Sequence, residues 1–250
     1  MNRSSTAELY ALTHRGNPGD AAFYERFCAG ATSILELGCG YGRLLAHLSC
    51  CAPRVVGVEL DRALLALARK NVRRLPAICR QAIRLRQGDM RRFELGERFE
   101  RVVLPYNGFF CLLSERDALA CLRSVRAALA DDGVFALDVW NADRLSRHGL
   151  SSADAQPLFS VEHGGRSWTV SEHTRVRARQ RLEVRYDYRP ARGVERSLTI
   201  LQRYFGAREL CALLARAGLR VRARYGDFNG AHFGSRSPQL VLTATRAARD

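Results

Sequence analysis

The sequence predicts an α/β fold: a mostly parallel sheet with helices on both faces and an inserted antiparallel β-sheet. Three observations lead to this prediction. Apolar runs alternate with helical patterns through the first 140 residues, a glycine-rich segment follows the first of these runs, and polar and apolar residues alternate between residues 151 and 203. A strand–helix–strand rhythm is typical of parallel strands, whereas a period of two is typical of antiparallel ones.

The parallel part is predicted from five apolar runs and the helices between them. Strands are expected near residues 33–37, 54–59, 83–87, 101–105 and 133–140. Helices are expected near residues 42–49, 62–74 and 116–130. Asp61 is placed to cap the second of these helices. Asp131, Asp132 and Gly133 predict a turn before the fifth strand.

The rest of the chain is predicted to form an insertion and then to complete the first sheet. Residues 151–203 hold three or four expected antiparallel strands, with a turn at residues 189–193. A helix near residues 207–217 ends at Gly218, and strands follow near 219–226 and 239–245. The expected division is therefore 1–150, 151–203 and 204–250.

The segment from Ile34 to Gly42, ILELGCGYG, is typical of a strand that opens onto a nucleoside-containing cofactor. Glycine adopts positive φ easily and leaves no Cβ between the backbone and a ligand. Glu59 closes the next apolar run about 20 residues later, where a Rossmann-like unit places the acid that holds a ribose diol. Arg43 follows the GxGxG pattern, so a dinucleotide loop is disfavoured. A tight turn between strand and helix is the alternative.

This pattern resembles motif I of class I S-adenosylmethionine-dependent methyltransferases, in which an acid precedes GxGxG; Glu36 stands at the place of that acid. Two further segments resemble the family: QGDM at residues 87–90, and RVVLPYN at residues 101–107, which resembles motif IV. The resemblance implies a Rossmann-like, seven-stranded sheet with an antiparallel last strand. It also implies S-adenosyl-L-methionine as the cofactor and S-adenosyl-L-homocysteine as the product.

The resemblance further implies which residues hold the cofactor. Glu59 would accept hydrogen bonds from both ribose hydroxyls, and Asp89 would meet the adenine amino group, with a solvated turn acid as the alternative for Asp89. The implied cofactor-binding set is Tyr24, Glu36, Gly38, Gly40, Gly42, Glu59, Leu60, Gly88, Asp89, Met90 and Leu104.

Three residues are expected to assist the methyl transfer. Tyr106 and Asn107 end the fourth strand, where an aromatic face and a carbonyl oxygen would favour a sulfonium methyl group; a polar strand end is the alternative. Tyr10, His14 and Phe23–Tyr24 resemble the lid helices of small-molecule methyltransferases that act on amines and related natural-product acceptors. His14 would accept a proton. Tyr24 would reach the cofactor carboxylate or close the acceptor site, unless its helix is only an amphipathic cover.

Acceptor contacts are predicted from polar and aromatic residues on elements expected to face the mouth of the pocket. The predicted substrate-binding residues are Tyr10, His173, Arg203 and Tyr225. Residues 202–228 resemble the C-terminal element of small-molecule enzymes of this family. Arg203 would bind an acceptor carboxylate through both arms of its guanidinium group, with a surface arginine as the alternative.

Charge and cysteine usage disfavour other classes. The formal net charge is +15, but Lys70 is the only lysine, and the arginines are spread along the chain without interleaved aromatic residues, so nucleic acid is disfavoured as a substrate. The eight cysteines include no CxxC pair, so no metal site is expected. No apolar run reaches about 18 residues and the N-terminus has no signal core, so we expect a cytoplasmic chain without a membrane span.

The predicted function is transfer of a methyl group from S-adenosyl-L-methionine to an amine or hydroxyl of a small metabolite or natural product. The alternatives are an RNA or protein methyltransferase and a non-catalytic regulatory subunit that binds the cofactor. The expected partner is a small-molecule acceptor, and the expected state is a monomer or homodimer.

Overall fold

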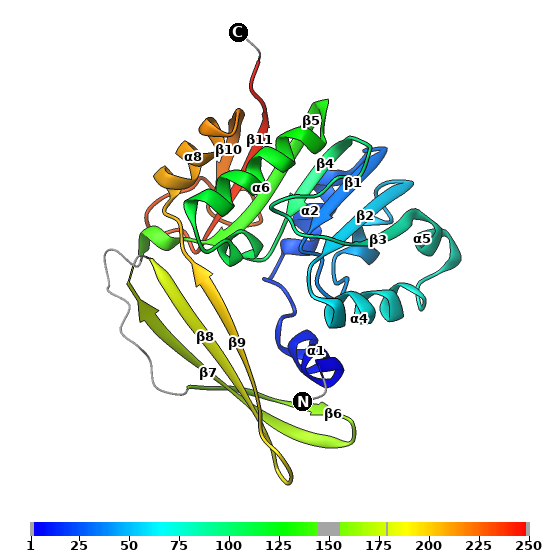
Figure 1. Cartoon of the computed structure of the whole chain (residues 1–250), viewed down its shortest axis with the longest axis vertical. Helices are drawn as coiled ribbons and strands as arrows, with labels where there is room; N and C mark the ends of the chain where they lie inside the picture. The colour runs from blue at the N-terminus through cyan, green and yellow to red at the C-terminus, as the bar shows by residue number, and fades with distance from the viewer. Residues whose placement is uncertain (1–2, 145–155, 179, 249–250) are drawn as a thin grey trace.

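The computed structural model describes residues 3–144, 156–178 and 180–248. Seven strands form its central sheet, in the order β10-β11-β5-β4-β1-β2-β3 (Figure 1). They are β1 (Ser33–Leu37), β2 (Arg54–Glu59), β3 (Ile83–Gln87), β4 (Phe99–Leu104), β5 (Leu129–Trp140), β10 (Leu219–Tyr225) and β11 (Gln239–Arg246). β11 runs antiparallel to the other six strands of this sheet, which run in one direction. The prediction of a seven-stranded, mostly parallel sheet is confirmed.

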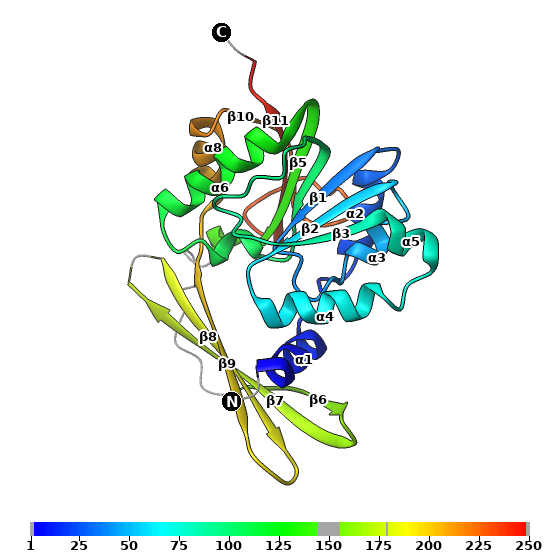
Figure 2. The same cartoon turned by 45° about the vertical axis from the view of Figure 1, so that its right-hand side comes forward.

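Helices cover both faces of the central sheet (Figures 1 and 2). They are α1 (Arg3–Thr13), α2 (Asp20–Cys28), α3 (Leu45–Leu48), α4 (Arg62–Val72), α5 (Ala77–Ala82), α6 (Glu115–Ala128) and α8 (Ala207–Arg216), with 3₁₀ turns η1 (Gly108–Cys111) and η2 (Ala142–Arg144). Apolar side chains of α2 and α3 pack on one face, and those of α6 and α8 pack on the other. Asp61 caps α4 as predicted, because its carboxylate accepts from the backbone amides of Ala63 and Leu64.

Two of the predicted boundaries are wrong for identifiable reasons. The first predicted helix shrinks to α3, because the chain turns through Gly42 at a φ of 82° before the helix begins. The turn predicted at residues 131–133 lies inside β5 instead, where the register with β4 shifts between the pairs Phe99↔Leu129 and Arg101↔Val134. Gly133 is required there, since a Cβ would lie 2.8 Å from the carbonyl oxygen of Phe99.

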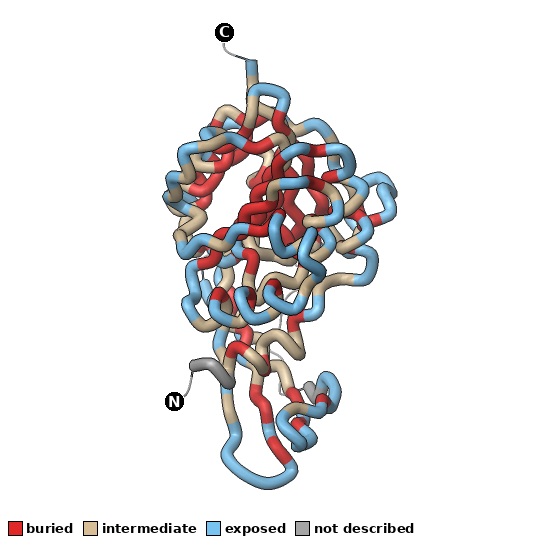
Figure 3. Tube along the Cα trace, turned by 90° about the vertical axis from the view of Figure 1, so that its right-hand side faces the viewer, coloured by how far each residue is buried: buried red, intermediate tan, exposed pale blue. Residues whose placement is uncertain are grey.

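The inserted sheet has four antiparallel strands in chain order (Figure 1). They are β6 (Gln156–His163), β7 (Arg166–Arg177), β8 (Arg181–Pro190) and β9 (Arg196–Arg203). Helix α1 lies between this sheet and the central one in both cartoon views, and its Leu9 packs into a small apolar cluster with Trp168 and Tyr188 (Figures 1 and 2). Buried residues are concentrated in the central sheet (Figure 3). Within the described residues, no helix is long and apolar enough to cross a membrane.

Candidate active site

The glycine loop after β1 forms a cradle at the carboxyl edge of the central sheet. Gly38, Gly40 and Gly42 have φ values of 64°, 56° and 82°. A Cβ on Gly40 would meet nothing within 4 Å, and one on Gly38 would meet only Leu104 at 3.9 Å. The space above these two glycines is therefore open to a ligand, and the main chain can contact it directly.

Glu59, at the end of β2, is already positioned beside this cradle. One of its carboxylate oxygens accepts from the backbone amide of Gly40 at 2.8 Å, and the other accepts from that of Asp61 at 2.7 Å. Burial raises the pKa of Glu59, while these amide hydrogen bonds act in the opposite direction. The amide of Leu60 also donates to this carboxylate. A carboxylate has about four acceptor sites, so these amides leave it able to accept from the hydroxyl groups of a vicinal diol. Leu60, next in the chain, is 60% exposed at the rim.

Glu36 lies near the end of β1. The surroundings of its carboxyl group test best whether the cradle fits the implied cofactor. The residue is 2% exposed, and its Oε2 atom has no hydrogen-bond partner in the described part of the chain. Burial raises the pKa of this carboxyl group to about 8, while the guanidinium group of Arg43 lowers it. An unpartnered buried carboxyl oxygen beside an open glycine cradle fits the ammonium group of a methionine portion.

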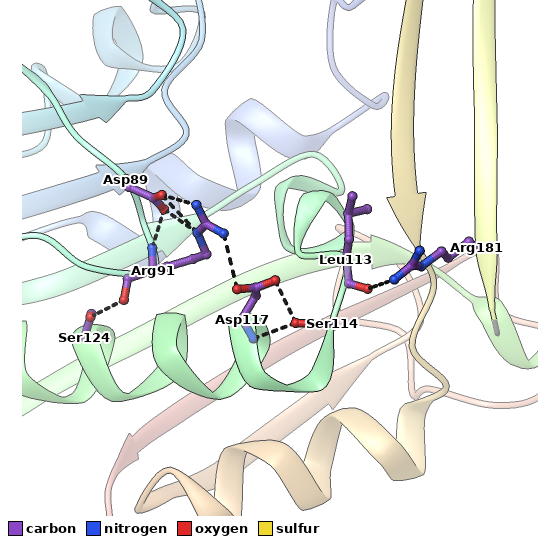
Figure 4. A network of polar contacts seen from close by, with 7 residues as sticks. All are labelled: Asp89, Arg91, Leu113, Ser114, Asp117, Ser124 and Arg181. Carbon is purple, nitrogen blue, oxygen red and sulfur yellow. Dashed lines mark hydrogen bonds and ion pairs between the residues drawn. The ribbon is translucent and has the colours of Figure 1, made fainter.

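Asp89 is held by an arginine that the sequence reasoning did not single out (Figure 4). The Nη2 of Arg91 donates to Asp89 at 2.6 Å, its Nε donates to both carboxylate oxygens, and its Nη1 donates to Asp117 at 3.2 Å. Asp117 lies in the first turn of α6, which Ser114 caps. These contacts lower the pKa of Asp89 and fix its carboxylate as an anion. Its adenine contact stays a prediction, as do those of the neighbouring Gly88 and Met90.

A buried aspartate supports the ends of β4 and β5, and the sequence reasoning missed it. The Oδ1 atom of Asp138 accepts from the hydroxyl of Tyr24 at 2.6 Å and from the backbone amide of Tyr106 at 2.9 Å. Burial raises the pKa of Asp138 to about 6. Tyr106 and Asn107 have φ values of 53° and 60°, a left-handed backbone conformation that residues other than glycine rarely adopt. Backbone strain of this kind persists where the surroundings impose it, often at functional sites.

The geometry corrects the predicted roles of two residues in this region. Tyr24 is fully buried and its hydroxyl group is committed to Asp138, so the cover-helix alternative describes it and it does not reach the cradle. The side-chain oxygen of Asn107 accepts from the backbone amide of Trp140 at 2.7 Å, so this group holds β5 instead of facing a ligand. Tyr106 keeps a partly accessible ring, with the guanidinium carbon of Arg43 at 5.7 Å from its centre.

His14 follows α1 and lies among aromatic rings beside the glycine loop, because the hydroxyl of Tyr41 in that loop donates to its carbonyl oxygen at 3.0 Å. Its ring stacks on Tyr10 with 3.8 Å between centroids and meets the rings of Tyr186 and Tyr106 edge-on at 4.8 and 6.3 Å. Its Nδ1 atom lies 2.8 Å from the hydroxyl oxygen of Thr13 and 3.1 Å from the carbonyl oxygen of Tyr10. Because a carbonyl can only accept, the tautomer that satisfies it carries the proton on Nδ1 and leaves Nε2 as the acceptor. Burial lowers the pKa of His14 to about 4. The ring is therefore neutral near pH 7, and one of its nitrogens is basic.

The structure contradicts one predicted acceptor contact, and two others stay predictions. His173 pairs with Asp187 at 3.0 Å on the face of the inserted sheet turned away from α1. The Nη2 atom of Arg203 donates to Glu209 at 2.6 Å, and its guanidinium group stacks over Phe205, so this side chain joins β9 to α8. Its Nη1 atom is buried without a partner among the described residues, so its acceptor contact stays a prediction. Tyr225 ends β10 and packs toward α2, so its acceptor role stays a prediction.

The raised pKa values predict how the stability of the ligand-free protein changes with pH. The folded pKa of Glu36 is about 8 against an ordinary value of 4.5, so the folded state holds the extra proton and stability falls as pH rises toward 8. Asp138 also makes stability fall as pH rises, but its contribution is largely lost by the time the pH reaches its folded pKa of about 6. The pKa of His14 is lowered, so His14 makes stability rise with pH, mainly below its ordinary pKa of 6.5. Between pH 6.5 and 8 the fall therefore comes mainly from Glu36.

We expect the unfolding free energy to fall by about 1–2 kcal/mol across that window, and Glu36→Gln to remove most of the fall. Urea unfolding of both proteins at several pH values between 6.5 and 8 measures it. If the unfolding free energy fell equally in the two proteins, Glu36 would not be the source of the pH dependence.

Comparisons with known proteins agree with this geometry. The family described as methyltransferase domain matches residues 34–133. The dTDP-3-amino-3,6-dideoxy-alpha-D-glucopyranose N,N-dimethyltransferase of Streptomyces fradiae is 34% identical over 189 residues, which cover 72% of this chain and 69% of that protein. The CcbJ methyltransferase of Streptomyces caelestis superimposes with a TM-score of 0.78 at 25% identity, covering 93% of this chain and 91% of that one.

A third similar protein was solved with its methyl donor bound. It is CalS10, an amino pentose methyltransferase from Micromonospora echinaspora, with a TM-score of 0.72 and 28% identity over 96% of both chains. The fit of the cradle to the implied cofactor, the family match and the identity to a curated relative all agree. The chain therefore belongs to the class I S-adenosylmethionine-dependent methyltransferases that act on small molecules.

Proposed function

We propose that this methyltransferase acts on the primary amine of a small amino sugar carried on a nucleoside diphosphate. The observation that carries the proposal is the group of rings around His14, a neutral imidazole beside the glycine loop. The curated relative from Streptomyces fradiae is named for a dTDP-linked amino sugar, and CalS10 is named for an amino pentose. Both names support an amine in preference to a hydroxyl.

Positioning and proton removal are the main tasks that the proposal gives to the chain. S-adenosyl-L-methionine supplies a methyl group on a positively charged sulfur atom. The cradle and Glu59 fix the donor, while Tyr10, Tyr106 and Tyr186 enclose the acceptor amine and exclude water. His14 Nε2 accepts the proton that the amine must lose, and its electron pair is then free to attack. Electron-rich ring faces favour a positively charged methyl group.

His14→Asn is expected to lower kcat by about 10–100-fold, near the low end for a general base because a pKa of about 4 makes imidazole weakly basic. Affinity for S-adenosyl-L-homocysteine should not change. The assay uses dTDP-3-amino-3,6-dideoxy-α-D-glucopyranose and scores products by the mass of one or two added methyl groups. The matched control is His47→Asn, because His47 lies on α3 paired with Glu25. An unchanged kcat would exclude His14 as the base.

The proposal also includes the finer predictions on organisation and setting. The insertion at residues 151–203 closes the acceptor side, supported by the contact between Tyr186 and His14. The proposed compartment is the cytoplasm. The proposed acceptor is a small molecule and not a nucleic acid, and the proposed oligomeric state is a monomer or homodimer. Light scattering on the purified protein measures the last of these, and salt-insensitive turnover of the sugar would argue against an RNA substrate.

A further inference from the structure

One face of the inserted sheet is turned toward α1 and the site. Strand register shows which residues share it, because side chains of directly paired residues lie on the same face. Tyr188 contacts Thr13 at 3.0 Å and Tyr186 contacts His14, so their face is the inner one. On β7 to β9 its residues are Trp168, Val170, Glu172, Thr174, Val176, Leu182, Val184, Tyr186, Tyr188, Pro190, Arg196, Leu198, Ile200 and Gln202.

Glu172 is the one carboxylate in that set, and it is linked to His14 through the ring of Tyr186. It pairs in register with Tyr186, whose hydroxyl group hydrogen-bonds to it. The hydroxyl of Thr174 donates to its Oε1 atom at 3.2 Å. Tyr186 in turn meets the His14 ring at 4.8 Å. The carboxylate is therefore oriented by two hydroxyl groups, one of which belongs to a ring that lines the proposed acceptor site.

Glu172 also has no cationic partner among the described residues, although the chain is rich in arginine. The sequence has 40 lysine and arginine residues against 25 acidic ones. On the opposite face of the inserted sheet, Glu183 pairs with Arg177 at 2.8 Å and Asp187 pairs with Arg185 at 2.7 Å. Among the described residues Glu172 makes no ion pair, although it is half-buried. A partly desolvated carboxylate without a cation attracts one from a ligand.

We propose that Glu172 binds the ammonium group of the acceptor and so makes the enzyme select an amine over a hydroxyl group. The inference rests on the proposed function and adds the residue that sets its specificity. Tyr186 and Thr174 hold the carboxylate, and His14 lies beside the bound ammonium group to take its proton. After the first transfer, the secondary ammonium product carries the same charge and keeps the same partner, which allows a second methyl group to be added without release.

The test compares two sugars that differ only in the group at one carbon. They are dTDP-3-amino-3,6-dideoxy-α-D-glucopyranose and its 3-hydroxy counterpart, dTDP-6-deoxy-α-D-glucopyranose. Each is titrated calorimetrically into protein saturated with S-adenosyl-L-homocysteine, for the wild type, for Glu172→Gln and for Glu183→Gln. Glu183→Gln is the matched control, since Glu183 lies on the opposite face and pairs with Arg177.

We expect the wild type and Glu183→Gln to bind the amine about 10-fold more tightly than the hydroxyl sugar, as a half-buried charge pair provides. Glu172→Gln should lose this preference by weakening for the amine alone, with its affinity for the hydroxyl sugar and for S-adenosyl-L-homocysteine unchanged.

A preference that survives in Glu172→Gln, or an equal loss for both sugars, would overturn the assignment of Glu172 while leaving the proposed function in place. Equal binding of both sugars by the wild type would also overturn it. Failure of the wild type to bind either sugar would instead refute the proposed acceptor class, and this inference with it.

Discussion

Glu59→Ala is expected to weaken the binding of S-adenosyl-L-homocysteine by about 3–5 kcal/mol, because two hydrogen bonds from the ribose hydroxyls to a charged group are lost. This corresponds to an affinity loss of roughly 10²–10⁴-fold. The same change leaves the backbone amides of Gly40 and Asp61 without their acceptor, so the loop that contacts the rest of the ligand also loses its support. Isothermal titration of the purified proteins with S-adenosyl-L-homocysteine measures the loss.

A control separates the loss of binding from a loss of folding. Glu94→Ala removes an exposed carboxylate on the segment between β3 and β4 and should leave the affinity unchanged. Circular dichroism at the titration temperature shows whether Glu59→Ala remains folded. Equal affinity of a folded Glu59→Ala and the wild type would remove the ribose assignment from Glu59.

The cofactor half of the site was predictable because its residues are determined by short stretches of chain. Glu36, Gly38 and Gly40 follow one another through the end of β1, and Glu59 ends the strand paired in parallel with it. Neighbouring parallel strands end at the same edge of a sheet, so knowledge of the strands is enough to bring these residues together. The central sheet was predictable for the same reason, since its apolar runs coincide with its strands.

The acceptor half depends on facts that a single sequence does not contain. His173 and Glu172 are adjacent, yet one faces away from α1 and the other faces Tyr186. A shift of one residue in strand register would exchange them, and register is decided by packing against α1. Asp138 lies within an apolar run that predicts a buried strand. The sequence does not show that the hydroxyl of Tyr24 and the amide of Tyr106 both donate to its carboxylate. Residues 151–155 of the predicted insertion lie outside the described chain.

Gly40→Val is expected to empty the cradle of its ligand while leaving the fold in place. A Cβ at residue 40 would have no neighbour within 4 Å, so the added side chain starts in open space that the cofactor needs. Overpacking by even one or two methylenes costs about 1–3 kcal/mol, and valine adds three carbons, so we expect affinity for S-adenosyl-L-homocysteine to fall about 100-fold or more.

The matched control is Gly30→Val, because Gly30 shares the backbone property but not the location. Its φ is 75°, a Cβ there would also meet nothing within 4 Å, and it precedes β1 whereas Gly40 follows it. Both variants should lose a similar amount of stability, about 1–2 kcal/mol for a side chain in the left-handed region. Thermal unfolding without ligand measures that shared cost, and titration measures binding. If Gly30→Val weakened binding as much as Gly40→Val, backbone strain and not occupancy of the cradle would be the cause, because only residue 40 lies beneath the ligand.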